Sequence, residues 1–169
     1  LYWPVATTTL DVDNFSLGAQ PTLLGRVTLG DYAGEYRCQE VQVQIRNSTG
    51  ATVWQGRLPL SVDGEFEVVY ETNVPAGIYD VAVRGTHWLQ RVVRGVSLPG
   101  AVVDVELVNG DVDGDNEVTL LDFGALVMAF GGMPGDANWN PNADLDGDGE
   151  VSLFDFGVLV KCFGEVGEG

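Results

Sequence analysis

The chain has 169 residues, a hydrophobic content of 45% and a formal net charge of −17. This length suits one domain or two small ones, and this hydrophobic content excludes wholesale disorder. The negative charge, with no basic cluster to offset it, excludes nucleic acid as a partner, and no apolar run approaches the roughly 20 residues of a transmembrane helix.

The first 22 residues predict an extended arm that precedes the folded part of the chain. Residues 1–10 are apolar and β-prone, and Pro4 restricts them to a sheet edge or an unpaired extended segment. We expect the arm to complete a sheet edge of a neighbouring copy of the chain; the alternative is an arm that folds back on its own domain. The side chains expected to make this contact are Leu1, Tyr2, Trp3 and Val5.

Residues 23–109 predict a domain of short strands. Apolar and polar residues alternate strictly over residues 41–46, as in a strand with one buried face. Turn signals recur between the later segments, and no stretch has a helical period. Further strands are expected at residues 52–55, 66–70, 78–84, 88–94 and 102–108. This pattern predicts an antiparallel β-sandwich.

One run within this domain resembles a known family. Pro75–Leu98 reads PAGIYDVAVRGTHWLQRVVRGVSL and combines a turn, a G-x-Y-x-V strand and a return strand. In these features residues 23–109 resemble carboxypeptidase-regulatory-like domains, which have a transthyretin-like fold. The resemblance implies a structural or interaction module and adds no chemistry.

The stretch that follows, residues 110–169, contains one motif written twice. Gly110–Gly131 reads GDVDGDNEVTLLDFGALVMAFG, and Ala143–Gly164 reads ADLDGDGEVSLFDFGVLVKCFG. Each copy opens a loop with acids at positions one, three and five, has Glu at position seven, and closes with Asp at position twelve. The predicted metal ligands are Asp111, Asp113, Asp115, Glu117 and Asp122, and then Asp144, Asp146, Asp148, Glu150 and Asp155.

This spacing is that of a calcium-binding loop. Hard cations prefer oxygen ligands, and a single turning loop brings alternate side chains, with the carbonyl of residue seven, onto one point. Position six needs a left-handed backbone, which Gly149 adopts freely and Asn116 tolerates. Merely acidic turns are the alternative, since Asp and Gly favour turns in any protein. The doubled motif favours calcium, and we expect two ions.

An apolar segment with helical spacing follows each loop. It predicts helices near residues 120–130 and 153–163, with their apolar faces packed together. Gly124 and Gly157 lie inside these helices, where each costs up to about 1 kcal/mol relative to Ala, so we expect another backbone to approach closely there. The matching apolar pairs are Leu121 and Phe154, Phe123 and Phe156, Leu126 and Leu159, Val127 and Val160, and Phe130 and Phe163.

Two loop–helix units without an entering helix, each closed by Asp, resemble the type I-like dockerin module. The resemblance implies two calcium ions, antiparallel helices, a cohesin domain as partner, and two binding orientations allowed by the near-twofold symmetry. Loop positions ten and eleven often set partner choice in that family, and large apolar residues stand here where small hydroxyl residues are common. The residues at these positions are Leu120, Leu121, Leu153 and Phe154.

The two cysteines lie in different halves of the chain. In an oxidising compartment Cys38 and Cys162 would be able to bridge the halves. The alternative is two unpaired thiols, with Cys162 acting as a small apolar residue on a helix. The sequence leaves both alternatives open.

No catalytic set is evident, so we expect no enzyme activity. His87 is the only histidine, and a lone histidine more often has a structural or solvated role. Neither cysteine has a histidine close in sequence. Four aromatic residues would be able to form a sugar-binding platform, although core packing explains them more simply. They are Trp54, Tyr70, Tyr79 and Trp88.

Three functions follow from these features. Only Asn109 and Gly110 separate the last expected strand from the first ligand, which favours a rigid, calcium-stabilised structural protein that self-assembles into an oligomer or filament. The dockerin resemblance favours an adaptor that docks to a cohesin-type partner on a cell surface or in a cellulosome-like complex. A carbohydrate-binding module is the third hypothesis.

We expect a secreted protein, extracellular or at the cell surface. The chain begins Leu-Tyr-Trp, which removal of a signal peptide would leave, although a chain cut elsewhere would look the same. Calcium modules that work outside cells bind the ion at about 10⁻⁴–10⁻³ M, and loops of this kind suit that range.

Overall fold

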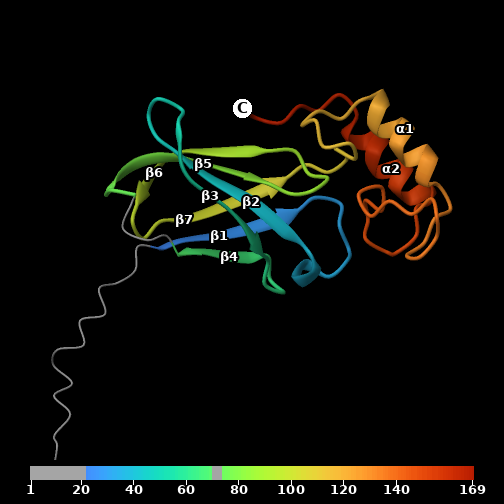
Figure 1. Ribbon diagram of the computed structural model, residues 1–169, viewed down its shortest axis with the longest axis horizontal. Coiled ribbons are helices and arrows are strands. Elements are labelled where there is room, and N and C mark those ends of the chain that lie inside the picture. The colour runs from blue at the N-terminus through green and yellow to red at the C-terminus, as the bar shows by residue number, and fades with distance from the viewer. Residues whose placement is uncertain (1–21, 70–73) are drawn as a thin grey trace, which may run out of the picture.

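The structure is a computed structural model that describes residues 22–69 and 74–169. The expected N-terminal arm, with its contact residues Leu1, Tyr2, Trp3 and Val5, lies outside the described residues, as does Tyr70. Strands form one end of the described chain and two helices the other (Figure 1). The elements are β1 (Thr22–Leu29), η2 (Tyr36–Cys38), β2 (Glu40–Arg46), β3 (Thr52–Pro59), β4 (Glu65–Val69), β5 (Gly77–Arg84), β6 (Arg91–Leu98), β7 (Val102–Leu107), α1 (Leu120–Ala129) and α2 (Leu153–Cys162).

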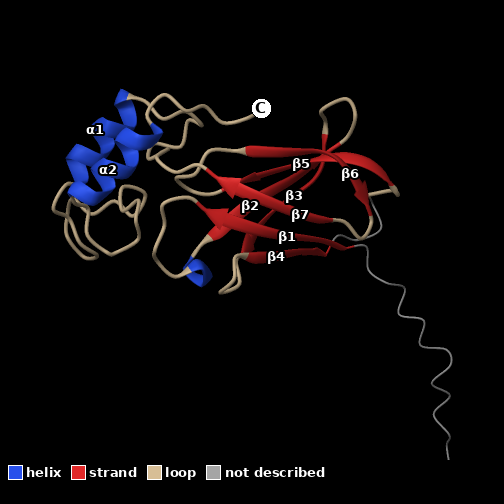
Figure 2. Cartoon of the chain, turned by 180° about the vertical axis from the view of Figure 1, so that it is seen from behind, coloured by secondary structure: helices blue, strands red, loops and turns tan. Residues whose placement is uncertain are grey.

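The strands form a sandwich of two sheets. One sheet has the order β4-β1-β7 and the other β3-β2-β5-β6, and Figure 2 shows the sheets from behind. Every pair is antiparallel except β1 with β7, which run parallel. The predicted antiparallel β-sandwich is therefore confirmed, with this one pair as an exception, because the first and last strands lie side by side and are connected only through the rest of the domain.

The inner faces of the two sheets make the first apolar core. Val41, Val43 and Ile45 of β2 are fully buried and alternate with partly exposed residues, as predicted. Trp54 and Tyr79 pack against this core, and Trp88 is buried within it. Burial of apolar surface therefore stabilises Trp54, Tyr79 and Trp88 in this core, as core packing predicts for these three residues.

The predicted strand at residues 88–94 begins later, at Arg91. Trp88 makes only an isolated bridge with Asn109 and belongs to the sandwich core, whereas the next residue, Leu89, belongs to the core beside the helices. Neighbouring side chains enter two different cores, so this segment joins the sandwich to the helical part instead of extending a sheet.

The second core lies between the two loop–helix units. Leu126 of α1 and Leu159 of α2 are buried in it, and the rings of Phe123 and Phe156 lie 5.8 Å apart. The two units exchange backbone hydrogen bonds: Val118 pairs with residues after α2, and Val151 pairs with Gly131 and Gly132 after α1. Each loop is thus fixed to the far end of the other unit.

The expected packing of the helices is only partly right. Leu126 and Leu159 are buried, but the other matched apolar residues keep a third or more of their surface exposed. Gly124 and Gly157 have no neighbouring atom within 4 Å of an added Cβ, so the predicted close approach of another backbone is wrong within the described chain. The glycines lie on an open face of the helices.

The cysteines are both free thiols. Cys38 is exposed in η2, and Cys162 is buried in the second core. The bridge that the sequence left open is therefore not formed, and the alternative of two unpaired thiols describes this structure. Burial raises the pKa of the Cys162 thiol, which keeps it protonated and apolar in character.

Candidate metal centre and partner surface

The first loop brings carboxylates together at the point where the sandwich ends. Oxygen atoms of Asp111, Asp113 and Asp122 all lie within 4.8 Å of one another. Asp111 and Asp122 are fully buried. The Oδ1 atom of Asp111 has no hydrogen-bond partner, although such an atom is costly to bury unsatisfied. A cation held between these carboxylates would satisfy it.

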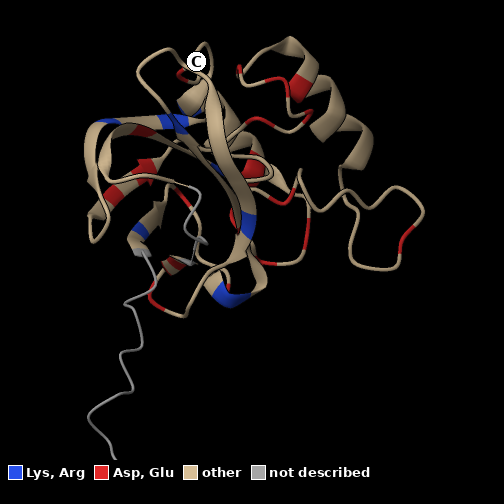
Figure 3. Ribbon diagram, turned by 60° about the vertical axis from the view of Figure 1, so that its left-hand side comes forward, with Lys and Arg blue, Asp and Glu red and all other residues tan. Residues whose placement is uncertain are grey.

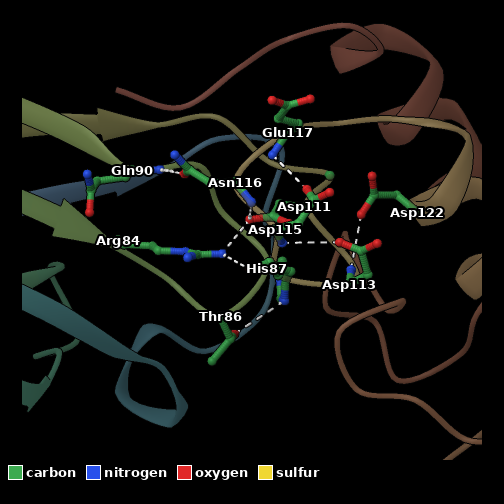
Figure 4. A network of polar contacts seen from close by, with 12 residues as sticks. Arg84, Thr86, His87, Gln90, Asp111, Asp113, Asp115, Asn116, Glu117 and Asp122 are labelled. Atoms are coloured by element: carbon green, nitrogen blue, oxygen red, sulfur yellow. Dashed lines mark hydrogen bonds and ion pairs between the residues drawn. The ribbon is translucent and has the colours of Figure 1, made fainter. Parts of the chain in front are cut away.

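Hydrogen bonds within the loop fix the direction of these side chains. The Oδ1 atom of Asp113 accepts the N–H of Asp115 at 3.1 Å, and the Oδ1 atom of Asp115 accepts the N–H of Glu117 at 2.9 Å (Figure 4). Asn116 turns the chain in the left-handed region, with φ of 76°. The loop therefore curls around one point, as the spacing predicted.

Asp122 closes the loop and also starts α1. Its Oδ1 atom accepts the N–H of Asp113 at 3.0 Å, and its Oδ2 atom accepts the N–H of Thr119 at 2.7 Å. The Thr119 hydroxyl in turn accepts the N–H of Leu121, which completes a capping box at the helix N-terminus. One carboxylate thus couples the loop to the helix.

The second loop repeats this arrangement. Oxygen atoms of Asp144, Asp146 and Asp155 lie within 4.8 Å of one another, and Asp155 is fully buried. Asp155 forms the capping box of α2 with Ser152, as Asp122 does with Thr119. Gly149 has φ of 91°, at the position that Asn116 occupies in the first loop.

The structure thus brings six of the ten predicted ligands into two groups of three. Asp115, Asp148, Glu117 and Glu150 lie in the same loops but are exposed and outside these groups. The two glutamates were expected to act through their backbone carbonyls, so exposed side chains agree with that expectation.

Burial sets the electrostatics of both groups. It raises the pKa of Asp111, Asp113, Asp144 and Asp146, because each carboxylate loses water on entering its loop. Crowded, desolvated carboxylates with only oxygen donors suit a hard divalent cation, which would offset the mutual repulsion. The residues present therefore fit calcium in each loop.

Arg84, at the end of β5, is a site residue that sequence reasoning missed. Its Nη2 atom donates to Asp111 Oδ2 at 2.7 Å and to the Gly114 carbonyl at 2.6 Å (Figure 4). No local motif would have found it, because the contact joins residues 27 positions apart.

His87 has a structural role at this junction. Its carbonyl accepts the N–H groups of Gly110 and Asp111 at 3.0 and 3.1 Å, and its ring lies 3.6 Å from that of Trp88. Burial lowers the pKa of the imidazole to about 3, so it is neutral at ordinary pH. The lone histidine therefore holds the first loop through its backbone, in agreement with the structural interpretation.

The open faces of α1 and α2 carry a second candidate site. We define the helix-face patch as the exposed apolar side chains around Gly124 and Gly157: Leu120, Leu121, Val127, Met128, Leu153, Phe154 and Val160. Phe154 is 74% exposed and Leu120 72%, and the two glycines are exposed at the centres of the two faces. Large apolar side chains that gather on exposed helix faces typically mark a protein–protein interface.

Acidic residues surround these helices. Figure 3 shows Asp and Glu along the loops beside them, whereas basic residues lie mostly on the strands. Lys161 is the only basic residue after residue 110, and its Nζ atom pairs with Asp31 of the sandwich at 2.6 Å. The helix-face patch therefore has an acidic border.

Two oxygen-lined loops, each leading into a helix, define a tandem metal-binding module. Residues 109–163 match the family model of the dockerin type I domain, so the chain carries a dockerin type I domain after its β-sandwich. The match supports calcium as the metal ion of this domain. A comparison with curated proteins finds no match.

Two solved structures share the whole arrangement. Both are mutants of a type II cohesin–X-dockerin complex from Acetivibrio cellulolyticus. An N-terminal interface mutant has a chain that is 24% identical with a TM-score of 0.66, over 86% of this chain and 96% of that chain. A C-terminal interface mutant has one that is 25% identical with a TM-score of 0.65 and the same coverage. These matches show that the two chains share the fold of this one, and the comparisons point to no enzymatic family.

Neither helix in the described part of the chain is long and apolar enough to cross a membrane.

Proposed function

We propose that this chain is a calcium-stabilised adaptor whose dockerin module binds a cohesin-type partner through the helix-face patch. The single observation that carries this proposal is the open apolar face of a matched dockerin domain, with Leu120 and Phe154 about three-quarters exposed. Such residues stay in water at a cost unless another protein covers them. The chain acts by protein contact and has no catalytic role.

The arrangement of the patch supports a partner that contacts the exposed faces of both helices. Leu120 and Leu121 of the first unit correspond to Leu153 and Phe154 of the second, and all four project into solvent at the helix N-terminal turns. The near repeat offers two related docking orientations. Large apolar side chains at these positions favour a cohesin with an apolar contact surface.

Two calcium ions, one in each loop, fix the conformation of the helices that carry this patch. The proposed ligands are the acids of each loop at positions one, three, five and twelve, with the carbonyls of Glu117 and Glu150. Because Asp122 and Asp155 both close a loop and cap a helix, an ion that holds them also fixes the start of each helix.

The similar structures support this choice of partner. They are named as complexes of a type II cohesin with an X-dockerin chain, and the present chain covers nearly all of the chain it matches in each. We assign residues 23–109 to the sandwich and 110–169 to the dockerin module; the arm expected at residues 1–22 stays a prediction, except that Thr22 already belongs to β1. The likeness of the sandwich to carboxypeptidase-regulatory-like domains stays a prediction, and so does secretion.

Self-assembly, which the sequence alone favoured, stays a prediction as well. Its expected contact residues lie outside the described part of the chain. The family match and the two complexes favour the cohesin adaptor over the self-assembling protein.

Binding assays with purified cohesins test the adaptor. The chain is titrated with a type II and a type I cohesin, in millimolar calcium and again in chelator. We expect calcium-dependent binding that Leu121→Asp with Phe154→Asp abolishes, while Val62→Asp, which changes an exposed valine of the sandwich, leaves it intact. Failure of both cohesins to bind, together with calcium-dependent self-association, would reject the adaptor in favour of self-assembly.

A further inference from the structure

The sandwich reaches one ligand carboxylate of the dockerin module, and it does so in the first loop alone among the described residues. We propose that Arg84 is a built-in counter-cation for this loop, so that the two loops differ in calcium dependence. The first loop stays folded against the sandwich at low calcium and binds the ion more weakly. The second loop requires the ion to fold. This inference rests on the calcium binding proposed above.

The two oxygen atoms of Asp111 have separate roles. Oδ2 is occupied, because it accepts a hydrogen bond from Arg84 at 2.7 Å and one from the N–H of Asn116 at 3.1 Å. Oδ1 is buried without a partner and belongs to the carboxylate group of the loop. The same carboxylate therefore faces the guanidinium on one side and the metal position on the other.

The corresponding carboxylate of the second loop has no such partner. Asp144 accepts the N–H groups of Gly147 and Gly149 at 3.0 and 3.1 Å, and no described basic residue pairs with it. The sandwich contacts this loop through neutral groups: the N–H of Ala33 donates to the Asp146 carbonyl, and the ring of Tyr32 covers Gly147. Those contacts place the loop without offsetting its charge.

Other contacts hold the first loop close to Arg84. The N–H of Gln90 donates to the side chain of Asn116 at 2.8 Å, and the N–H of Gly167 donates to the carbonyl of the same asparagine. Glu168 then bonds to Gln90 and to the N–H of Val92 on β6. The loop is thus fixed between the sandwich and the C-terminal tail by bonds that need no ion.

Electrostatics decides which state Arg84 favours. Without the ion, its guanidinium is the one positive charge among the described residues that touches the buried Asp111 carboxylate, and it stabilises the folded loop. With the ion, two cations share one carboxylate and repel each other. Arg84 therefore stabilises the ion-free loop more than the ion-bound loop, which by linkage lowers calcium affinity there.

Three variants of the full chain test this assignment. Arg84→Gln removes the charge, and Arg84→Lys keeps it. Arg57→Gln is the control: Arg57 lines a surface cavity together with Arg84 and has no ion pair among the described residues, so this variant removes an equal charge nearby. Calcium titrations followed by NMR report the loops separately, through the amides of Asn116 and Gly149. Hydrogen exchange in chelator shows which loop stays folded.

We expect Arg84→Gln to tighten calcium binding at the first loop by about fivefold or more, the effect of roughly one charge pair a few ångströms apart in water. In Arg84→Gln, the calcium affinity of the second loop should stay within about twofold of the parent value. In Arg84→Lys and Arg57→Gln, the calcium affinity of both loops should stay within the same range. In chelator, the amide of Asn116 in the parent chain should be protected from hydrogen exchange, and the amide of Gly149 should not. Arg84→Gln should remove the protection of Asn116.

Unchanged or weaker binding at the first loop in Arg84→Gln overturns the assignment, as does equal protection of the two loops in chelator. If Arg84→Gln unfolds in chelator, restoration of its fold by calcium supports the assignment, and failure of calcium to restore it shows a purely structural role. A parent chain that takes up no calcium at all rejects the proposed calcium function itself, which is a different result from these.

Discussion

The sandwich and the dockerin module keep their shapes by different means. The sandwich buries a large apolar core between its two sheets, with Ile45 of β2 and the ring of Trp88 fully buried in it. Each ten-residue helix of the module buries only three residues, and one of the three is a carboxylate, Asp122 or Asp155. Helices this short are marginal by themselves in water. Apolar burial therefore stabilises the sandwich, whereas the metal loops must stabilise the helices.

Removal of calcium is expected to have the largest effect. In chelator, amide protection should be lost throughout α2 and, beyond the first loop that Arg84 holds, in α1 as well, because the closing aspartates then repel their neighbours without an ion between them. Protection in β2 and β5 should be unchanged, since no loop ligand comes from these strands. Hydrogen exchange followed by mass spectrometry measures both. Helices that stay protected in chelator would contradict the division of roles.

Trp88→Ala is expected to cost the sandwich about 3–5 kcal/mol of unfolding free energy, the usual range for a large buried aromatic side chain. The ring is fully buried and lies 5.3 Å from that of Tyr32. Urea unfolding in calcium measures the loss. The matched change Trp139→Ala removes a partly buried ring beside the helices and should cost clearly less. Equal costs would mean that both regions depend on apolar burial alike.

Acid should weaken the junction through His87. Its pKa is lowered to about 3 in the fold and returns to an ordinary value near 6.5 on unfolding. The unfolded chain therefore binds a proton that the folded chain does not, so this stability is present above about pH 6.5 and is lost as pH falls toward 3. The expected slope is about 1.4 kcal/mol per pH unit.

The contribution of His87 is the difference between the parent and His87→Gln, measured as unfolding free energy between pH 7 and pH 4.5. The carboxylates of the loops titrate in both proteins, so their effect cancels in the difference. Parallel pH profiles would show that the histidine is not held neutral in the fold.

The metal groups were predictable from sequence because each is local. Asp111 and Asp122 lie in one turning loop, so spacing alone fixes their geometry, and the strand at 41–46 follows from strict alternation in the same way. The helices were predictable as well, from an apolar period that follows each loop.

Features that depend on distant partners were not predictable. The contact of Arg84 with Asp111 depends on where β5 ends relative to the first loop, and nothing near Arg84 in sequence marks it. The parallel pairing of β1 with β7 is a property of the closed sandwich. The glycines of the helices were misread because sequence shows that a side chain is missing but not whether the space beside it is filled.

The smallest expected effect separates stability from binding. Gly124→Ala should stabilise the module by about 0.5–1 kcal/mol, because Ala is the better helix former and its methyl group meets no atom within 4 Å. Gly131→Ala is the control: it also has open space, but its φ of 73° strains any other residue, so it should destabilise. Urea unfolding in calcium measures both.

The same alanine should weaken binding to a cohesin, although it stabilises the free chain. Gly124 lies among Leu120, Leu121 and Met128 on the exposed face of α1, where a partner that packs closely leaves no room for a methyl group. Gly157→Ala should act alike on α2. Calorimetry with a cohesin compares the two variants with the parent chain. An alanine that stabilises the helix and leaves affinity unchanged would show that the partner does not reach the centre of this face, and the contact would then rest on Leu121 and Phe154 at the helix starts.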